Sequence, residues 1–296
     1  MNAAPQPVPR TDRQNGSERI SSRDYARLCE LIRAQAGINL GAEKRTMLEI
    51  RIKRRLKALQ LESYAEYCDF LFSRRGMDEE IVHLIDVVST NKTDFFREAK
   101  HFDFLAQRVL PEWTTARGSA ARPFLIWSAG CSTGEEPYTL GIVLSEYGQA
   151  WPAFQFQILA TDISTAVLAK AHRGIYAAEA TKAISDSLRR KYFLRSRDAS
   201  QQRLRIVPEV RNQVQFRRLN FMDSDYGVAE PVDAIFCRNV IIYFDRATQQ
   251  RILARLCRCL APGGYLFVGH AETLHQMNLP LIPEAPSLYR RTEQVQ

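Results

Sequence analysis

The stretch WSAGCSTGEEPY, residues 127–138, decides how the second half of this chain is interpreted. It follows the apolar run PFLIWS and precedes apolar residues at helical spacing, so it reads as a strand, a glycine-containing turn and a helix. Such turns often bind phosphate, because the backbone N–H groups that open a helix attract anions. This turn has Gly130 and Gly134 but not the GxGxxG spacing of a dinucleotide loop.

Two acids, Glu135 and Glu136, follow the turn directly and would repel a phosphate. They could simply stabilise the positive end of the helix dipole. Alternatively, the turn binds a ligand that carries positive charge and no phosphate. S-adenosylmethionine has these properties, because it combines an adenosine with a sulfonium and an amino-acid tail.

The flanking residues extend this pattern into an α/β domain. Strands are predicted at 123–128, 154–162, 214–220 and 232–239, and YLFVGH and SLYRRTE are candidates for two more. Helices are predicted at 136–147, 164–173 and 246–260, the last of them ended by APGG. Strands rich in Val, Ile and Phe that alternate with helices predict a mostly parallel sheet covered on both faces.

A segment of about 40 residues before position 214 departs from this alternation of strands and helices. It contains the short alternating runs RKYFLRSR and QRLRIVP, which predict an inserted antiparallel β-subdomain at about residues 188–213. The ligand-binding α/β domain as a whole is expected to cover residues 123–296.

The first part of the chain predicts helices. Residues 1–20 are polar, contain proline and lack an apolar signal-peptide core, so we expect a disordered tail there. An all-α domain is predicted at 21–95, with Gly37 ending its first helix and a capping box of Ser63 and Glu66 opening its third. Residues 96–122 are expected to form a connecting helix, ended by Pro111, and a small polar linker at 112–122.

Composition narrows the class of protein. The chain has 296 residues, 45% of them apolar and 25% charged, as in soluble globular proteins, and no run is long and apolar enough for membrane insertion. Six scattered cysteines form no CxxC pair, which predicts reduced thiols and no metal. The net charge of +8 is concentrated at 44–57 and 189–218, which suggests an acidic partner, either a protein or a nucleic acid.

Polar residues at the carboxyl ends of the predicted strands are the site candidates, because ligands of parallel α/β sheets bind there. Asp162 ends the second strand and Asn220 the third, while Arg238, Asn239 and Tyr243 follow the fourth. A carboxylate such as Asp162 can accept hydrogen bonds from a ribose diol. It could equally cap the next helix, and its position alone does not separate the two interpretations.

Several stretches in the same order resemble the CheR family of chemotaxis-receptor methyltransferases. They are STNKTDFFRE, WSAGCSTGEEPYTL, ATDIS, GIY, IFCRNVIIYF and GHAETL, and the resemblance runs from about residue 20 to 290. It implies a Rossmann-like class I methyltransferase domain with an inserted antiparallel β-subdomain, preceded by an all-α N-terminal domain. It also implies S-adenosyl-L-methionine as the cofactor and S-adenosyl-L-homocysteine as the product.

The resemblance assigns roles by position in the motifs. Arg97 and Tyr243 resemble residues placed close to methyl transfer. The positions that resemble the cofactor site are Asn91, Thr93, Arg97, Glu136, Asp162, Asn220, Phe221, Arg238, Asn239 and Val240. Arg97 could instead form only a surface ion pair, and Tyr243 could instead contribute only to packing.

The function that this resemblance implies is methylation of glutamate side chains on cytoplasmic helices of chemoreceptors. A basic helix carrying Arg51, Arg54 and Arg55 would contact the receptor, unless it is only a solvated face. The loop RSRDASQQR, residues 195–203, lacks the glycines with which some family members grip a receptor pentapeptide, so we expect pentapeptide independence. We expect a cytoplasmic monomer recruited to membrane-bound receptor arrays, with no nucleic acid and no membrane insertion. The alternatives are a nucleic-acid methyltransferase and a non-catalytic receptor-docking adaptor.

Overall fold

The computed structural model describes residues 19–117, 122–198 and 200–292, so the predicted tail at 1–20 lies almost wholly outside the described residues. The chain divides into two units, the first at 1–31 and 40–88 and the second at 32–39 and 89–296. In the described ranges, no helix has both the length and the apolar character that crossing a membrane requires. All six cysteines are free thiols.

The first unit is helical, as expected. Its helices are α1 (Ser22–Ala36), whose residues from 32 on belong to the second unit, α2 (Arg45–Leu59), α3 (Tyr64–Leu71) and α4 (Arg74–Val88), with the short 3₁₀ turn η1 (Ala42–Lys44) before α2. Gly37, which follows α1, has a left-handed φ of +72°, the conformation that ends many helices. The capping box is also confirmed, because Ser63 Oγ accepts the N–H of Glu66 at 3.2 Å.

Helix α2 buries one face and uses part of its basic face inside the first unit. Leu48, Ile52 and Leu56 are buried at helical spacing. The guanidinium of Arg55 makes two hydrogen bonds of 2.8 Å with the carboxylate of Glu80, which is 1% exposed. Arg51 donates to a backbone carbonyl of α4. Arg54, by contrast, is exposed.

The connecting helix differs from the expectation. Helix α5 (Lys100–Phe104) continues through a π-helical turn, η2 (Leu105–Val109), into α6 (Leu110–Arg117). Pro111 therefore does not end the helix, and residues 112–117 of the predicted linker are helical. Proline lacks an N–H donor but is tolerated in the first turn of a helix, and the wider turn before it marks where α6 begins.

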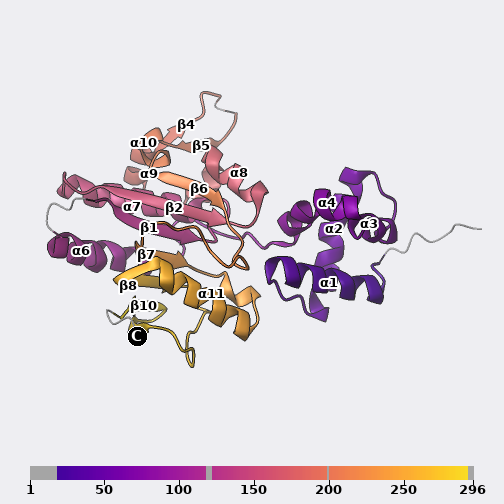
Figure 1. Cartoon of the computed structure of the whole chain (residues 1–296). Helices are drawn as coiled ribbons and strands as arrows, with labels where there is room; N and C mark the ends of the chain where they lie inside the picture. The colour runs from indigo at the N-terminus through magenta and orange to yellow at the C-terminus, as the bar shows by residue number, and fades with distance from the viewer. Residues whose placement is uncertain (1–18, 118–121, 199, 293–296) are drawn as a thin grey trace, which may run out of the picture. The chain divides into compact units, whose positions relative to one another are not determined.

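The second unit is built on a seven-stranded sheet with the order β6-β2-β1-β7-β8-β10-β9 (Figure 1). The strands are β1 (Phe124–Ala129), β2 (Phe156–Asp162), β6 (Val214–Arg218), β7 (Val232–Cys237), β8 (Leu260–Val268), β9 (Leu281–Ala285) and β10 (Leu288–Arg291). The first five in spatial order are parallel, and β10 is antiparallel to both neighbours. The chain runs outward from β1 to β6 and then returns to β7, so the order reverses between β1 and β7. This switch point is where such sheets bind ligands.

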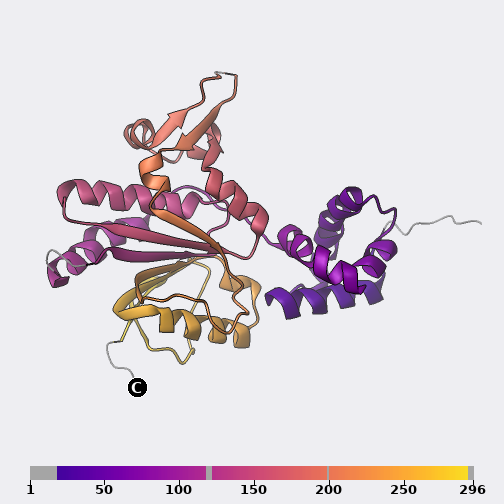
Figure 2. The same ribbon diagram turned by 45° about the horizontal axis from the view of Figure 1, so that its top comes forward.

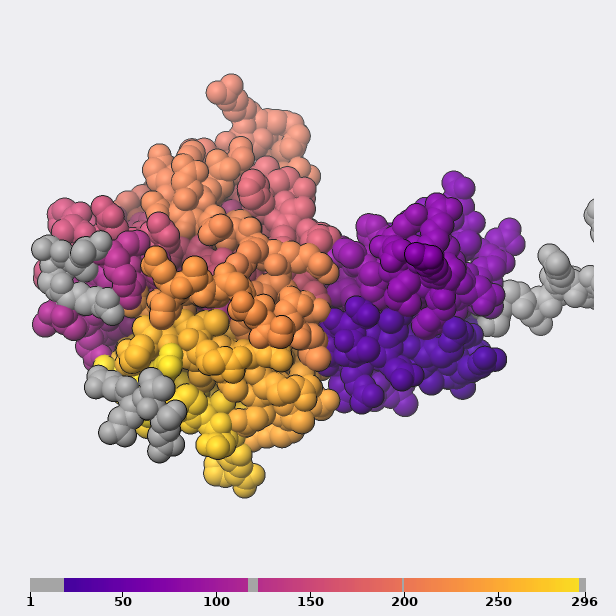
Figure 3. Space-filling model, viewed as in Figure 1, coloured from indigo at the N-terminus to yellow at the C-terminus, as the bar shows by residue number. Residues whose placement is uncertain are grey.

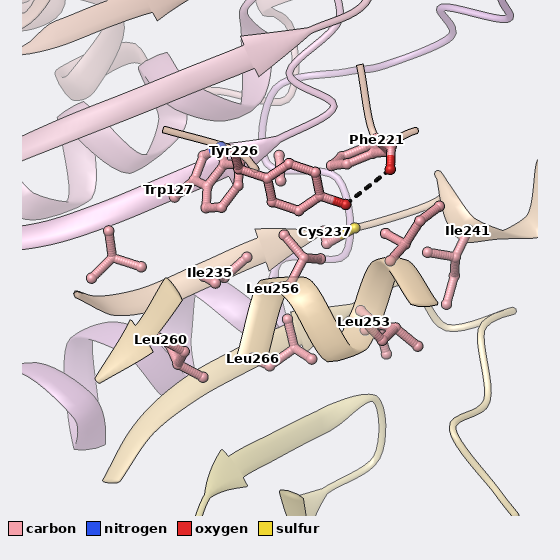
Figure 4. Close-up of a cluster of buried hydrophobic side chains, with 14 of the residues drawn as sticks. Trp127, Phe221, Tyr226, Ile235, Cys237, Ile241, Leu253, Leu256, Leu260 and Leu266 are labelled. Carbon is pink, nitrogen blue, oxygen red and sulfur yellow. Dashed lines mark hydrogen bonds between the residues drawn. The ribbon is translucent and has the colours of Figure 1, made fainter. Parts of the chain in front are cut away.

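Residues of β7 alternate between two apolar layers that fix the sheet between helices. Ala234 and Phe236 pack in a cluster with residues of α5, η2, α6 and α7 (Glu135–Ala150). Ile235 and Cys237 face the opposite cluster, which includes Leu253 and Leu256 of α11 (Arg246–Cys259) (Figure 4). The expected two-sided cover is thus confirmed, and α7 and α11 lie on opposite faces of the sheet (Figure 2).

A second sheet confirms the predicted β-subdomain and enlarges it. It has the order β3-β5-β4 and consists of β3 (Ile175–Ala177), β4 (Phe193–Arg195) and β5 (Arg203–Ile206). The predicted start at 188 is too late, because the strand after α8 (Thr165–Arg173) pairs with β5. The remaining short helices of this region are η3 (Ala178–Thr181), α9 (Asp186–Tyr192) and α10 (Pro208–Arg211). The β4–β5 hairpin projects from the surface of the second unit (Figure 3).

One strand boundary and one additional strand also depart from the expectation. β8 begins at Leu260, directly after α11, and its register with β7 shifts so that APGG bulges out of the ladder. β9 is an edge strand that the sequence does not predict, since Pro283 weakens its strand pattern.

Replacing Arg55 by alanine is expected to destabilise the first unit by about 3–5 kcal/mol, because it leaves the carboxylate of Glu80 buried without its cation. Urea unfolding followed by circular dichroism measures the change. The matched control is Arg54→Ala, which removes an exposed arginine of the same helix and should cost less than about 0.5 kcal/mol. Equal losses in both variants would contradict the structural role of Arg55.

Candidate functional site

The loop between β1 and α7 is shaped by glycine. Gly130 and Gly134 have φ values of +89° and +96°, which L side chains rarely adopt. A Cβ added to Gly130 would lie 2.4 Å from Cγ2 of Val240, so this loop packs directly on the loop that follows β7. The two loops flank the switch point of the sheet, as the sequence predicts for a ligand site.

Asp162 holds the first loop in place. Its Oδ2 accepts the N–H of Ser132 at 2.9 Å, and its Oδ1 accepts the N–H of Ser164 at 2.9 Å. Ser164 caps helix α8, because its Oγ accepts the N–H of Val167. The interpretation of Asp162 as the helix cap is therefore wrong.

The adjacent acids Glu135 and Glu136 point to different partners. Thr133 Oγ1 donates to Glu135 at 2.6 Å. Ser128 Oγ donates to Glu136 at 2.7 Å, and the second oxygen of Glu136 lies 3.5 Å from Nε of Arg238. Burial raises the pKa of both carboxyls, and Arg238 opposes that rise at Glu136. Glu136 therefore faces the switch point through Arg238, whereas Glu135 is engaged within its own loop.

The segment 91–98 lies beside these loops. The carbonyl of Asn91 accepts the Oγ–H of Ser132 at 2.8 Å, and the carbonyl of Arg97 accepts a hydrogen bond from the Arg238 guanidinium. The side chain of Arg97 donates to the carbonyl of Lys92 at 3.0 Å, and it forms no ion pair with an acid of the described residues. Thr93 lies half-buried in the same segment. The structure thus brings this predicted segment to the loop of β1.

Glu272 organises the loop after β7, and the sequence does not single it out. Its two oxygens accept the backbone N–H groups of Asn239, Val240 and Ile241 at 2.8 Å and that of Gly269 at 2.6 Å. Burial raises the pKa of Glu272, and these four bonds oppose the rise. The clamp holds Asn239 at a left-handed φ of +58°. The residue lies in the GHAETL motif, which was the only signal for it.

The remaining predicted residues lie near the segment 32–39. Asn220 Nδ2 donates to the carbonyl of Gln35 at 2.6 Å, and the carbonyl of Tyr243 accepts the N–H of Asn39 at 2.9 Å. Phe221 is buried in the apolar cluster under α11 (Figure 4). The N–H of Leu219 bonds the carbonyl of Asp162 at 3.0 Å, which brings this strand end next to the first loop.

Among the described residues, one group has the geometry to hold a metal ion. The ligand atoms of Glu98, His101 and His270 lie within 4.8 Å of one another. Nε of Arg238 is 3.6 Å from Oε2 of Glu98, and its fixed positive charge works against a divalent cation. Burial lowers the pKa of His101 to about 4, so its imidazole is neutral near pH 7.

The donor set fits a cationic cofactor better than a phosphate-bearing one. The loop of residues 130–136 offers carboxylates and carries no lysine or arginine. The absence of a Cβ at Gly130 lets this loop pack against Val240, and Asp162 accepts the N–H of Ser132 in the same loop. These features agree with the ligand that the sequence indicates.

Comparison with known proteins is consistent across both units. Residues 23–89 match the family model described as CheR methyltransferase, all-alpha domain, and residues 91–284 match CheR methyltransferase, SAM binding domain. A chemotaxis protein methyltransferase of Borreliella burgdorferi is 37% identical over 92% of this chain and 95% of its own length. Those of Escherichia coli and Salmonella typhimurium are 39% and 38% identical, over 87% of this chain and 87% and 86% of theirs.

Replacing Glu272 by glutamine is expected to weaken binding of S-adenosylmethionine about tenfold or more. An amide NH₂ would then face backbone donors, and leaving a buried donor unpaired costs about 1–3 kcal/mol. Isothermal titration calorimetry measures the affinity. Glu284→Gln is the matched control, because Glu284 pairs with the exposed Arg108 at 3.1 Å. Unchanged affinity in a folded Glu272→Gln protein would mean that the loop keeps its shape without the carboxylate.

Proposed function

We propose, because this chain belongs to the CheR methyltransferase family, that it methylates glutamate side chains on the cytoplasmic helices of chemoreceptors. The S-adenosylmethionine-binding domain of the family covers residues 91–284, so the chain is an S-adenosylmethionine-dependent protein methyltransferase. The observation that carries the proposal is a set of hydrogen bonds that bring the predicted site segments together at the switch point. Ser132 bonds to Asp162 and to the carbonyl of Asn91, and Arg238 bonds to the carbonyl of Arg97. The relatives named above are chemotaxis protein methyltransferases, which supports receptor glutamates as the substrate.

Within this proposal, the cofactor residues are those predicted from the sequence. Asp162 would accept hydrogen bonds from the ribose, and Asn220 and Phe221 would lie beside the adenine. Glu136 would be the acidic residue of the cofactor loop. The floor of the site would consist of Arg238, Asn239 and Val240, and Asn91 and Thr93 would close one side. The contacts of Glu136 with Ser128 and Arg238 at the end of β1 support these roles.

The chemistry requires alignment more than acid–base catalysis. S-adenosylmethionine supplies an electrophilic methyl group on a sulfonium. A receptor carboxylate, with an ordinary pKa of about 4.3, is already ionised near neutral pH and needs no strong base. Arg97 would orient one carboxylate oxygen by a charge-assisted hydrogen bond, and Tyr243 would assist by hydrogen bonding. Holding a weak nucleophile in line and away from water accounts for the remaining acceleration.

The basic segment 189–218 gives little support to a nucleic-acid substrate. Several of its arginines donate to backbone carbonyls of the same unit, namely Arg205, Arg211, Arg217 and Arg218. Lys191 forms an ion pair of 2.6 Å with Glu146. Because these side chains serve the fold, they do not form a stripe of free cations such as a phosphate backbone would need.

A direct assay distinguishes the substrates. Labelled S-adenosylmethionine is incubated with the protein and either receptor-bearing membranes or RNA. We expect label in the receptor that is released by mild base, as carboxyl methyl esters are. Label in RNA would favour the nucleic-acid alternative, and binding of cofactor and receptor without transfer would favour the adaptor. Receptor methylation by the isolated protein would also fit a cytoplasmic monomer that acts on membrane-bound receptor arrays.

The receptor-binding surface that we propose is the exposed part of the basic face of α2. Lys53, Arg54 and Lys57 are exposed, whereas Arg51 and Arg55 also make contacts within the first unit. Reversing Arg54 and Lys57 to glutamate is expected to raise the receptor KM about tenfold and leave cofactor affinity unchanged, because both charges would then repel an acidic helix. Steady-state methylation and calorimetry measure the two quantities.

The control for this surface is Arg75→Glu, which reverses an arginine on α4 that is 78% exposed. It should leave the receptor KM near the wild-type value. A similar rise in KM for the α2 and α4 variants would indicate a general effect of net charge.

Pentapeptide independence is a separate part of the proposal. The segment between β4 and β5 contains no glycine, and Asp198 accepts the N–H and Oγ–H groups of Ser200 there. Calorimetric titration with the receptor pentapeptide should therefore show no micromolar binding, and methylation should not depend on the receptor tail. Saturable micromolar binding would overturn this expectation.

A further inference from the structure

We infer that Tyr176 is a positioning residue that connects the small β-sheet to two parts of the methyl-transfer site, the loop after β1 and the segment that carries Arg97. The inference rests on the proposed function, because that proposal places both parts in the site. Tyr176 lies on β3, in the GIY stretch of residues 174–176, and is 3% exposed. Its side chain therefore acts inside the second unit and not on a partner.

The hydroxyl of Tyr176 holds the loop after β1. Tyr176 Oη donates to the carbonyl of Thr133 at 2.8 Å. The next residue, Gly134, has a left-handed φ of +96°, and a Cβ added there would lie 2.8 Å from the same Oη atom. The loop thus approaches the hydroxyl closely because residue 134 has no side chain. Thr133 and Gly134 lie directly before α7, whose first turn contains Glu136, so the bond acts where that helix begins.

The ring of Tyr176 holds the segment that carries Arg97. Phe95, two residues before Arg97, is 1% exposed, and its ring centroid lies 4.9 Å from that of Tyr176 in an edge-to-face pair. Phe193 of β4 makes a second edge-to-face contact with Phe95, with the centroids 5.6 Å apart. Phe95 thus contacts aromatic rings from two strands of the small sheet, and these contacts restrict where Arg97 can lie.

The turn around Arg97 depends on such contacts. Phe96 and Glu98 have left-handed φ values of +55° and +57°, which residues other than glycine keep only where their surroundings fix them. The N–H of Phe96 donates to Thr139 Oγ1 of α7 at 3.2 Å, and the ring contacts of Phe95 add to this bond. Loss of the ring contacts should therefore let Arg97 move, whereas loss of the Tyr176 hydroxyl should act on the loop after β1.

Two substitutions in the full-length protein separate the hydroxyl from the ring. Tyr176→Phe keeps the ring and removes the hydrogen bond to the carbonyl of Thr133. We expect its affinity for S-adenosylmethionine, measured by isothermal titration calorimetry, to fall about five- to tenfold, because a buried carbonyl loses its donor. Its kcat for receptor methylation at saturating cofactor should stay within about twofold of the wild-type value, since the ring contact is retained.

Tyr176→Leu removes the ring as well as the hydroxyl. Its kcat at saturating cofactor should fall about tenfold or more, because a small displacement of an orienting group has a large effect on rate. Phe95→Met removes the same ring pair from the other partner and should lower kcat similarly. The double variant should lose little more than either single variant, since the effects of residues in direct contact are not additive. Retention of kcat by Tyr176→Phe would identify the ring as the positioning element.

Tyr64→Phe is the matched control for the loss of a buried tyrosine hydroxyl. Tyr64 is 4% exposed, and its Oη donates to the carbonyl of Glu49 at 3.1 Å in the helical unit. This variant should leave both cofactor affinity and kcat unchanged. Urea unfolding of every variant reports its stability, so a loss of function can be compared with a loss of folding.

Three outcomes would overturn the inference. Wild-type cofactor affinity in Tyr176→Phe would mean that the hydroxyl does not position the loop after β1. Wild-type kcat in Tyr176→Leu, or in Phe95→Met if the leucine variant does not fold, would mean that the ring does not position the segment of Arg97. Equal losses of affinity in Tyr64→Phe and Tyr176→Phe would indicate general destabilisation. If the wild type methylates no receptor, the proposed function fails, whereas the affinity of Tyr176→Phe still tests the hydroxyl.

Discussion

The four hydrogen bonds that Glu272 accepts from backbone N–H groups are the interaction on which the rest of the site depends. They hold Asn239 in a left-handed conformation and place Val240 against Gly130. The loop after β7 and the loop after β1 can then meet at the switch point. A buried carboxylate accepts such bonds strongly, since each is charge-assisted and water does not compete. The position of several candidate site residues follows from this one contact.

The charges around that loop meet at one buried arginine. Arg238 is the shared cation of Glu98 and Glu136, and Asp162 is already engaged with the β1 loop. The adjacent acids Glu135 and Glu136, which make the β1 loop unsuitable for phosphate, have different partners. Glu136 contacts Arg238, whereas Glu135 bonds within its own loop.

The clusters of basic residues do not by themselves identify a binding surface. Arg55 balances a buried glutamate inside the helical unit, and many arginines of residues 189–218 bond backbone carbonyls within the second unit. Clusters of arginine in a sequence do not distinguish structural cations from a binding surface, because their partners lie elsewhere in the chain. Pro111 illustrates the same limit for helices, since the π-helical turn before it allows the helix to continue.

The sequence by itself determined the type and order of most elements, the helix ends at Gly37 and Ser63, the phosphate-free character of the β1 loop and the family resemblance. These depend on neighbours a few residues apart, through hydrophobic period, capping and turn chemistry. Only the tertiary structure decided which charges meet, namely Glu272 with the β7 loop, Glu98 and Glu136 with Arg238, and Arg55 with Glu80. Such pairs join residues that are distant in the chain, and packing of the sheet and helices, not local spacing, sets their distances.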